Sequence, residues 1–356
     1  MNQHRPTVLL SGASGVVGRA LIDELTPDHD VICLYHRAPI DDPRVEVVQG
    51  DLTRADAGLE RGELAALCDR LDVVLHCAAN TKWNTPRDEI MNTNLGGTTR
   101  MLEIARRSGA RMVHMSTAFV ARDGAQADAA GGGVTAYVKS KVASENLVRD
   151  SGLPWTIVRP SVLIGDSRDG RIAAFQGIHK VIGATYRGTL PVLPADLDSM
   201  IDFVPQDVVA RAVGRLIRDP QAGGEHWLTA GDQALRLTEM VELTLDLAEL
   251  TGPRPHPPRM VPVEAVDRLL LPMLEDVLPV GIRRQFSAFA ELMLLFQSRT
   301  AMPSSLPALG LGDEVSHAAL CRAFRLSAEQ LVNRRDRAAR PAPAAVPAAT
   351  ATAVAG

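Results

Sequence analysis

Tyr137 and Lys141 are four residues apart in the run Thr135-Ala-Tyr-Val-Lys-Ser-Lys. On a helix, this spacing puts both side chains on one face. A free tyrosine has a pKa of about 10, so it needs a nearby positive charge to exchange a proton near neutrality. The Lys141 ammonium could supply that charge and lower the pKa of Tyr137, and it could also hold the nicotinamide ribose of a bound cofactor. Alone, the pair is a weak signal, since a solvated helix surface can carry the same two residues.

Ser116 and Thr117 directly follow the apolar run Met112-Val-His-Met, which predicts a buried strand. Open α/β sheets bind ligands at the carboxyl ends of their strands. A hydroxyl at this position could donate a hydrogen bond to a substrate carbonyl oxygen. The two hydroxyls therefore predict a site for a carbonyl group beside Tyr137.

A glycine-rich turn stands near the N-terminus, between a strand pattern and a helix pattern. Its spacing is Gly-x-x-Gly-x-x-Gly, which lets the backbone approach a pyrophosphate and presents helix N–H groups to the phosphates. The strand-turn-helix context distinguishes it from an ordinary glycine-rich turn. The residues expected to hold the dinucleotide are Gly12, Ser14, Gly15, Val16, Val17 and Gly18.

The end of the second predicted strand indicates which dinucleotide is bound. An NAD site usually has an acid here for the ribose 2′-hydroxyl, but Tyr35 occupies the expected place. Arg37 is nearby and Arg19 follows the last glycine, and either guanidinium could bind a 2′-phosphate. We therefore favour NADP(H) over NAD(H). The alternative is that both arginines are solvated surface charges.

Two further segments are expected beside the cofactor. Asp51 could accept a hydrogen bond from the adenine amino group, with Leu52 against the ring. Alternatively, Asp51 caps the next segment. Ala78 and Ala79 follow the fourth predicted strand, where small residues let the backbone approach the ribose. His76, just before them, is interpreted as a core histidine.

These residues require a scaffold of alternating strands and helices. Short apolar runs alternate with amphipathic stretches through the first half of the chain, which is typical of βαβ crossovers. We predict an α/β fold, a Rossmann-type doubly wound parallel sheet with a smaller, mostly helical C-terminal region. The expected strands begin at Val8, Val31, Val45, Val73, Met112 and Trp155, and the expected helices span 16–25, 62–69, 88–107 and 136–150.

The predicted organisation has three parts. Residues 1–165 form the NADP-binding core, and residues 166–335 form a substrate-binding region interleaved with late core elements. The latter includes a strand at Trp227 and a helix over 237–250. Residues 336–356, rich in Pro and Ala, are expected to be disordered.

Composition excludes several classes of protein. The 356 residues carry a net charge of −4, so no bulk attraction to nucleic acid is expected. No apolar run reaches the ~18 residues of a membrane-spanning helix, and the first strand begins too early to leave room for a signal peptide. The four cysteines include no Cys-x-x-Cys pair, which argues against disulfides or a metal site and for a reducing, cytoplasmic location.

The motifs together resemble the extended short-chain dehydrogenase/reductases over about residues 5–235. The resemblance rests on the glycine turn, Asp51-Leu52, Asn94-x-x-Gly97-Thr98, Ser116-Thr117, Tyr137-x-x-x-Lys141 and Arg159-Pro160-Ser161. It implies that Tyr137 is the acid/base, Lys141 its partner and Thr117 the carbonyl donor. Thr117 is preferred to Ser116 because Ala118-Phe-Val follows it. It also implies that Asn94 supports the active site and that Pro160 to Val162 pass the nicotinamide.

Three later runs are similar to thioester reductase domains and fatty acyl-CoA reductases. They are Tyr137-Val-Lys-Ser-Lys-x-x-x-Glu145, Gly165-Asp-Ser-Arg-x-Gly170 and Ile201-Asp-Phe-Val-Pro-x-Asp207. This resemblance implies NADPH-dependent reduction of a carrier-protein or CoA thioester to an aldehyde, sometimes an alcohol. Two rivals stay open: a ketone/alcohol oxidoreductase or nucleotide-sugar epimerase/dehydratase of the same family, and a non-catalytic dinucleotide sensor.

Two segments could shape the substrate site. Residues 122–134 are rich in glycine and small residues and could form a mobile loop beside Tyr137, or a plain connector. The Leu/Met-rich stretch 264–297 could line an acyl pocket. A helical core, a homodimer face or an interfacial membrane helix are its alternatives.

Overall fold

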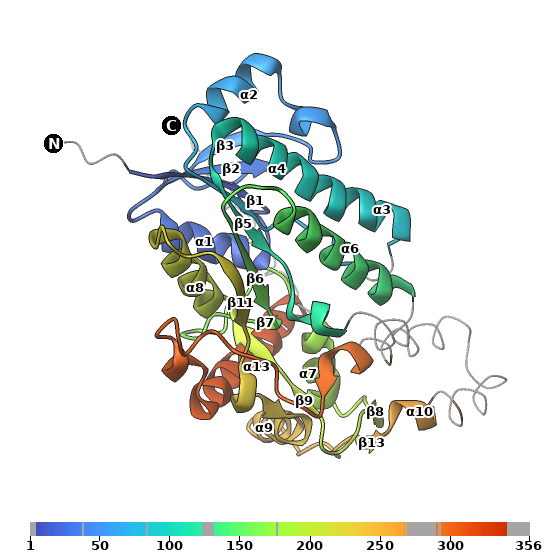
Figure 1. Cartoon of the computed structure of the whole chain (residues 1–356). Helices are drawn as coiled ribbons and strands as arrows, with labels where there is room; N and C mark the ends of the chain where they lie inside the picture. The colour runs from blue at the N-terminus through green and yellow to red at the C-terminus, as the bar shows by residue number, and fades with distance from the viewer. Residues whose placement is uncertain are drawn as a thin grey trace, which may run out of the picture.

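The structure is a computed structural model that describes residues 5–37, 39–82, 85–122, 132–175, 177–266, 268, 290 and 293–339. Within these residues, seven parallel strands form one sheet in the order β11-β6-β5-β4-β1-β2-β3 (Figure 1). The strands are β1 (Thr7–Ser11), β2 (Asp30–Tyr35), β3 (Glu46–Gln49), β4 (Val73–His76), β5 (Arg111–Met115), β6 (Trp155–Pro160) and β11 (Gly224–Leu228). The order reverses direction at β1, as in a doubly wound sheet, which confirms the predicted fold class.

Helices cover both faces of the sheet. In β1, Val8 and Leu10 belong to one buried cluster and Leu9 to another, because successive strand residues point to opposite faces. α1 (Val16–Leu25) and α8 (Gln206–Arg218) pack together on the first face. α2 (Arg61–Cys68), α4 (Gly97–Ser108) and α6 (Gly132–Arg149) cover the second. The near-continuous apolar strands follow from burial on both sides.

The helix expected over 88–107 is interrupted. α3 (Arg87–Met91) and α4 are joined by a π-helical turn, η2 (Asn92–Gly96). Such single π turns often occur at functional sites, and Asn94 lies inside this one. The helix ends at Gly109, which has a φ of +69°. α6 ends at Arg149, and Gly152 has the positive φ of +71° expected for a glycine after a helix.

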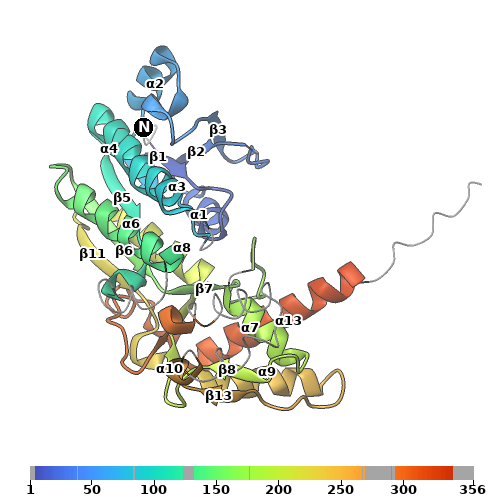
Figure 2. The same ribbon diagram turned by 90° about the vertical axis from the view of Figure 1, so that its right-hand side faces the viewer.

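The C-terminal elements gather below the sheet in Figures 1 and 2. Short strands pair within this region: β7 (Val162–Ile164) with β10 (Phe203–Pro205), β8 (Val192–Pro194) with β13 (Arg259–Val261), and β9 (Met200–Ile201) with β12 (Leu235–Arg236) and β14 (Gln297–Ser298). The helices are α7 (Gly177–Tyr186), α9 (Leu237–Glu249), α10 (Val263–Ala265) and α13 (His317–Ala339). Single 3-10 turns are η1 (Ala55–Gly58), η3 (Ala118–Arg122), η4 (Gly231–Gln233) and η6 (Gly312–Val315).

The loop over Gly165–Gly170 joins this region to the core. A Cβ on Gly170, which has a φ of +70°, would lie 2.2 Å from the carbonyl oxygen of Leu326 in α13. The Gly165 amide donates to the Ser327 hydroxyl at 3.2 Å. Within the same loop, the Ser167 hydroxyl donates to the Asp207 carboxylate at 2.6 Å. The two glycines of this run thus let α13 pack closely against the core.

Several expected segments are only partly described. α13 continues to Ala339, so residues 336–339 are helical and not part of the predicted disordered tail; the rest of that tail lies outside the described residues. Most of 264–297 and of the loop 122–134 also lies outside them. Among the described residues, no helix is long and apolar enough to cross a membrane.

Candidate active site

The glycine turn packs directly against the end of β4. Gly12 has a φ of +79°, and a Cβ there would lie 2.6 Å from the Ala78 amide nitrogen. A Cβ on Gly18 would lie 2.2 Å from the carbonyl oxygen of Gly12. Both distances are too short for any side chain, so glycine is required at these positions. α1 begins after Gly15 without a side-chain cap, which leaves its first amides available to an anion.

A cavity of about 240 Å³ lies beside this turn. Its wall combines residues that are distant in sequence but predicted to share one site. Those lining residues are Gly12, Gly15, Val16, Val17, Gly18, Ala79, Thr117, Tyr137, Lys141, Pro160 and Val162. The structure therefore brings the candidate catalytic side chains and most of the candidate cofactor residues together.

Thr117, Tyr137 and Lys141 meet in the buried wall of this cavity. The Tyr137 and Thr117 side chains share a hydrogen bond. Lys141 donates from Nζ to the main-chain oxygen of Met115 at 2.8 Å. Tyr137 is 7% exposed and Lys141 is 4% exposed. A hydroxyl pair beside a buried ammonium is an arrangement that can bind a carbonyl oxygen and pass it a proton.

Burial shifts the pKa values of both Tyr137 and Lys141. Burial raises the pKa of Tyr137 to about 12, although the hydrogen bond with Thr117 acts to lower it. Burial also lowers the pKa of Lys141 to about 8, opposed by Cys77 and Glu145. A lowering of the tyrosine pKa by Lys141 therefore does not prevail in this structure. The physical reason is burial, because removing a phenolate from water is unfavourable.

Asn94 links the π turn to α6. Its Nδ2 donates to the Ser140 hydroxyl at 2.9 Å and to the Asn80 carbonyl oxygen at 3.2 Å, and its Oδ1 accepts from the Asn80 amide at 2.7 Å. The Ser140 hydroxyl in turn donates to the carbonyl oxygen of Tyr137 at 2.7 Å. Asn94 thus lies behind the cavity wall, where it holds the backbone that carries Tyr137.

Six of the predicted cofactor residues are absent from the wall of this cavity. Ser14, Arg19, Arg37, Asp51, Leu52 and Ala78 are not in its wall. Asp51 accepts hydrogen bonds from the Thr53 amide and hydroxyl at 2.9 and 2.6 Å, which is a local turn and not a cap, since η1 has Arg54 at its N-cap position. The Asp51 carboxylate also lies 3.5 Å from His36, a residue that sequence reasoning missed. The Arg19 and Arg37 side chains are exposed.

Two further hydroxyls and two aromatic rings also line the cavity. Among the described residues, the buried hydroxyls of Ser116 and Ser161 have no hydrogen-bond partner, and both line the cavity. Phe119 and Phe296 stack with ring centroids 5.4 Å apart. Ser161 lies in the stretch Pro160–Val162, which was predicted to pass the nicotinamide. Phe296 lies in the stretch 264–297, for which the lining of an acyl pocket was one of the expectations.

These features fit a dinucleotide. The turn excludes side chains at Gly12 and Gly18, α1 offers uncapped amides, and two buried hydroxyls lack partners. Together with the strand order, they define the class of NAD(P)-binding oxidoreductase domains with a Rossmann-type sheet. The residues that would hold the cofactor are those of the turn and of Pro160–Val162.

Comparison with known families identifies the group within this class. Residues 34–213 match the NAD-binding family described as male sterility protein. The match covers half of the chain, and the protein belongs to this family of extended short-chain dehydrogenase/reductase domains. It is an NAD(P)-dependent reductase domain of that type.

Two curated relatives are much longer than this chain. Equisetin synthetase of Fusarium heterosporum is 32% identical over 157 residues, which are 41% of this chain and 4% of the relative. L-2-aminoadipate reductase of Schizosaccharomyces pombe is 26% identical over 267 residues, which are 66% of this chain and 18% of the relative. The chain therefore matches one small part of each of these enzymes.

A solved structure matches nearly the whole chain. The terminal R domain from the myxalamid PKS-NRPS biosynthetic pathway superposes with a TM-score of 0.73, covering 94% of this chain and 93% of that domain. The two sequences are 23% identical. At this identity the likeness establishes a shared fold that includes the C-terminal region.

Proposed function

We propose that this protein is an NADPH-dependent reductase that converts an acyl thioester, presented on a carrier protein or CoA, into an aldehyde. The observation that carries the proposal is the meeting of Thr117, Tyr137 and Lys141 in one buried cavity with the glycine turn. The same three side chains argue against a non-catalytic sensor, which would need none of them.

In the proposed reaction, a bound NADPH supplies the hydride. The Thr117 and Tyr137 hydroxyls hold the substrate carbonyl oxygen and stabilise the negative charge that develops on it. Tyr137 donates the proton to that oxygen. Collapse of the resulting hemithioacetal breaks the carbon–sulfur bond and yields an aldehyde and a thiol. The overall change consumes one hydride and one proton per thioester.

Burial of Lys141 supports a role beside the tyrosine. An ammonium with a pKa of about 8 is charged at neutral pH, so it can stabilise a tyrosinate formed during proton transfer. The pKa of about 12 for Tyr137 favours the protonated form before the reaction. A tyrosine held protonated is suited to act as the acid in a reduction.

The thioester is favoured over other carbonyl substrates by the relatives and by the cavity. One relative is, by its name, a reductase of L-2-aminoadipate, and a solved structure that covers 94% of this chain is a terminal R domain of a PKS-NRPS pathway. The stacked rings of Phe119 and Phe296 give the cavity an apolar side, which suits an acyl chain better than a sugar.

The preference for NADPH over NADH is also proposed. The end of β2 has Tyr35 where an NAD site usually has an acid, and Arg37 follows with an exposed side chain. Arg19 is exposed at the start of α1. Neither arginine lines the catalytic cavity, as expected for groups that would contact the remote 2′-phosphate.

The decisive experiment follows NADPH oxidation with matched acyl groups. An acyl-CoA, the same acyl chain on a phosphopantetheinyl carrier protein, the corresponding aldehyde and a methyl ketone of equal length would be compared, with product identified by mass spectrometry. We expect thioesters to be consumed with stoichiometric release of thiol. Turnover of the ketone alone would instead establish a ketone reductase. NADPH binding without turnover of any substrate would establish a sensor.

A further inference from the structure

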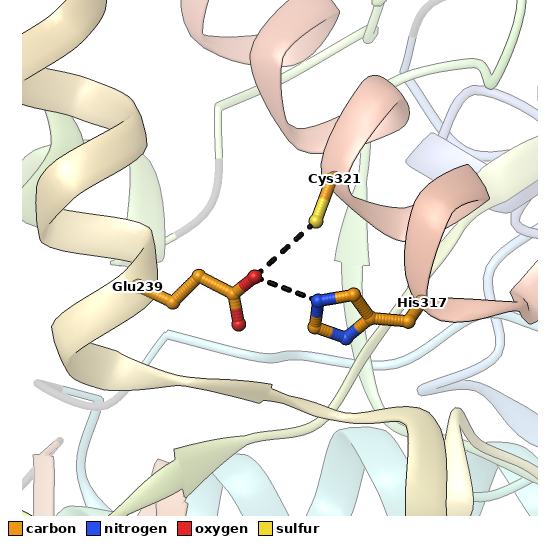
Figure 3. Close-up of side chains that lie close together, drawn as sticks. All are labelled: Glu239, His317 and Cys321. Carbon is orange, nitrogen blue, oxygen red and sulfur yellow. Dashed lines mark hydrogen bonds and ion pairs between the residues drawn. The ribbon is translucent and has the colours of Figure 1, made fainter.

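We propose that Glu239, His317 and Cys321 form a binding site for a divalent transition-metal ion of the zinc type. The three side chains converge between α9 and α13, as Figure 3 shows. They contribute one carboxylate oxygen, one imidazole nitrogen and one sulfur. This site goes beyond the proposed reductase function and does not depend on it.

Two helices bring the three ligand atoms together. Glu239 lies in the first turn of α9, and His317 is the first residue of α13. Cys321 follows His317 by four residues, so both point from one face of α13. The two helices pack against each other. A His-x-x-x-Cys pair has no special meaning in the sequence, and the third ligand comes from a segment almost eighty residues away.

The spacing of the atoms suits a small tetrahedral ion. His317 Nε2 lies 2.7 Å and Cys321 Sγ lies 3.5 Å from Glu239 Oε1. All three ligand atoms lie within 4.8 Å of one another. Ligands about 2.0–2.3 Å from a tetrahedral zinc are roughly 3.3–3.8 Å apart. The three atoms therefore need to move by less than about 1 Å, and water can fill the fourth position.

The ligand types select among metals. A sulfur, an imidazole and a single carboxylate suit zinc and its neighbours, whereas calcium and magnesium prefer sites made of oxygen. Burial and the Glu239 carboxylate raise the pKa of Cys321. The thiol therefore keeps its proton when no metal is bound, and metal binding must release it. Arg325, one turn further along α13, acts in the opposite direction on this thiol.

The position of the cluster indicates a structural role. None of the three residues lines the active-site cavity. The ion would join the start of α9 to the start of α13, and α13 is the helix that packs against Gly170. Binding would thus fasten the C-terminal helix to the rest of the substrate region and stabilise the folded chain.

The test uses the chelator-treated full-length protein with Zn²⁺ and Co²⁺. We expect one equivalent of Zn²⁺ to bind in competition with a chromophoric chelator and to raise the melting temperature. We also expect Co²⁺ to give a thiolate-to-cobalt absorption band. Cys321→Ser and His317→Gln should each abolish the band and weaken Zn²⁺ binding at least tenfold. Cys68→Ala and His256→Gln, which change the same residue types elsewhere, should leave both unchanged.

Two other outcomes would contradict the proposed metal site. If the wild-type protein shows no Co²⁺–thiolate band, then the three side chains form only a hydrogen-bonded contact between helices. If Zn²⁺ binding survives either Cys321→Ser or His317→Gln at full strength, then the ion is held by other ligands. His317 has a half-exposed side chain, so His317→Gln should fold and keeps the test informative even if Cys321→Ser does not.

Discussion

Lys141 donates a 2.8 Å hydrogen bond from Nζ to the main-chain oxygen of Met115. Met115 is the last residue of β5 and directly precedes Ser116 and Thr117. The bond therefore fastens α6 to the strand end that presents the Thr117 hydroxyl. Tyr137 lies one turn before Lys141 on the same helix. The contact therefore also helps to set the distance between the Thr117 and Tyr137 hydroxyls. A lysine expected to act on a tyrosine and on the cofactor thus also joins a helix to a strand.

We predict that Tyr137→Phe lowers kcat by about 10²–10⁴-fold, the usual contribution of a positioned acid, without unfolding the protein. The ring keeps its packing and only the hydroxyl is lost. Tyr186→Phe is the matched control, since its hydroxyl binds Thr251 away from the cavity. Steady-state NADPH oxidation and circular dichroism would be measured for both. An unchanged rate for Tyr137→Phe would remove the catalytic assignment.

Arg37→Ala should raise KM for NADPH roughly tenfold or more, because a lost charge-assisted hydrogen bond costs at least about 1.5 kcal/mol. KM for NADH should hardly change. Arg254→Ala, another exposed arginine but in the C-terminal region, should affect neither cofactor. Equal effects of Arg37→Ala on NADPH and NADH would contradict the proposed contact with the 2′-phosphate.

Removing the charge of buried Glu145 should destabilise the protein far more than removing that of Glu225, although both acids pair with Arg159. Arg159 Nη2 lies 2.7 Å from Glu145 and Nη1 lies 2.6 Å from Glu225, but the side-chain exposures of the two acids are 2% and 32%. Glu145→Gln leaves the buried guanidinium with only the more exposed Glu225 as an acidic partner and should lower the free energy of unfolding by ~3 kcal/mol. Glu225→Gln should cost about 1 kcal/mol. Urea titrations of both variants would show whether burial decides the difference.

Two glycines with the same backbone conformation provide a test of how α13 docks. Gly152 and Gly170 have φ values of +71° and +70°, but only a Cβ on Gly170 would meet another backbone. Gly152→Ala should cost the left-handed strain of ~1–2 kcal/mol. Gly170→Ala should cost a further ~1–3 kcal/mol from overpacking and expose α13 to proteolysis. Equal melting temperatures of the Gly152→Ala and Gly170→Ala variants would show that the docking of α13 does not depend on this contact.

His76 and His114 should make the protein sensitive to acid. Burial lowers the pKa of His76 to about 3 and that of His114 well below its ordinary value of 6.5. The folded chain keeps both rings neutral, so below about pH 6.5 protons bind preferentially to the unfolded chain. Stability should therefore fall with decreasing pH, by at most about 1.4 kcal/mol per pH unit for each histidine.

His114→Leu should flatten this loss. Both ring nitrogens of His114 lack a hydrogen-bond partner among the described residues, so a leucine gives up no such contact. Melting temperatures between pH 7 and pH 5 would be compared with those of His256→Gln, an exposed control. A slope that is unchanged in His114→Leu would mean that this ring is protonated or hydrated in the folded protein.

Much of the site could be read from the sequence because its chemistry lies in local patterns. The glycine spacing, the Tyr-x-x-x-Lys pair and the Ser-Thr pair each have a fixed place relative to a strand or helix. Parallel strands bring their carboxyl ends to one edge, so the order of the motifs was enough to predict that Gly12, Thr117 and Tyr137 share a cavity. The alternation of short apolar runs with amphipathic stretches likewise predicted the strands and the helices on both faces of the sheet.

Only the tertiary structure decided which distant segments come into contact and which side chains are buried. Phe296 reaches the cavity, and Glu239 meets His317 and Cys321, only because chain segments far apart in sequence pack together. The raised pKa of Tyr137 follows from desolvation, which no local pattern encodes. Sequence thus determined which groups this protein brings to its chemistry, because their spacing is local. Only the folded chain decided their solvation and their remaining partners, because these are properties of the packed interior.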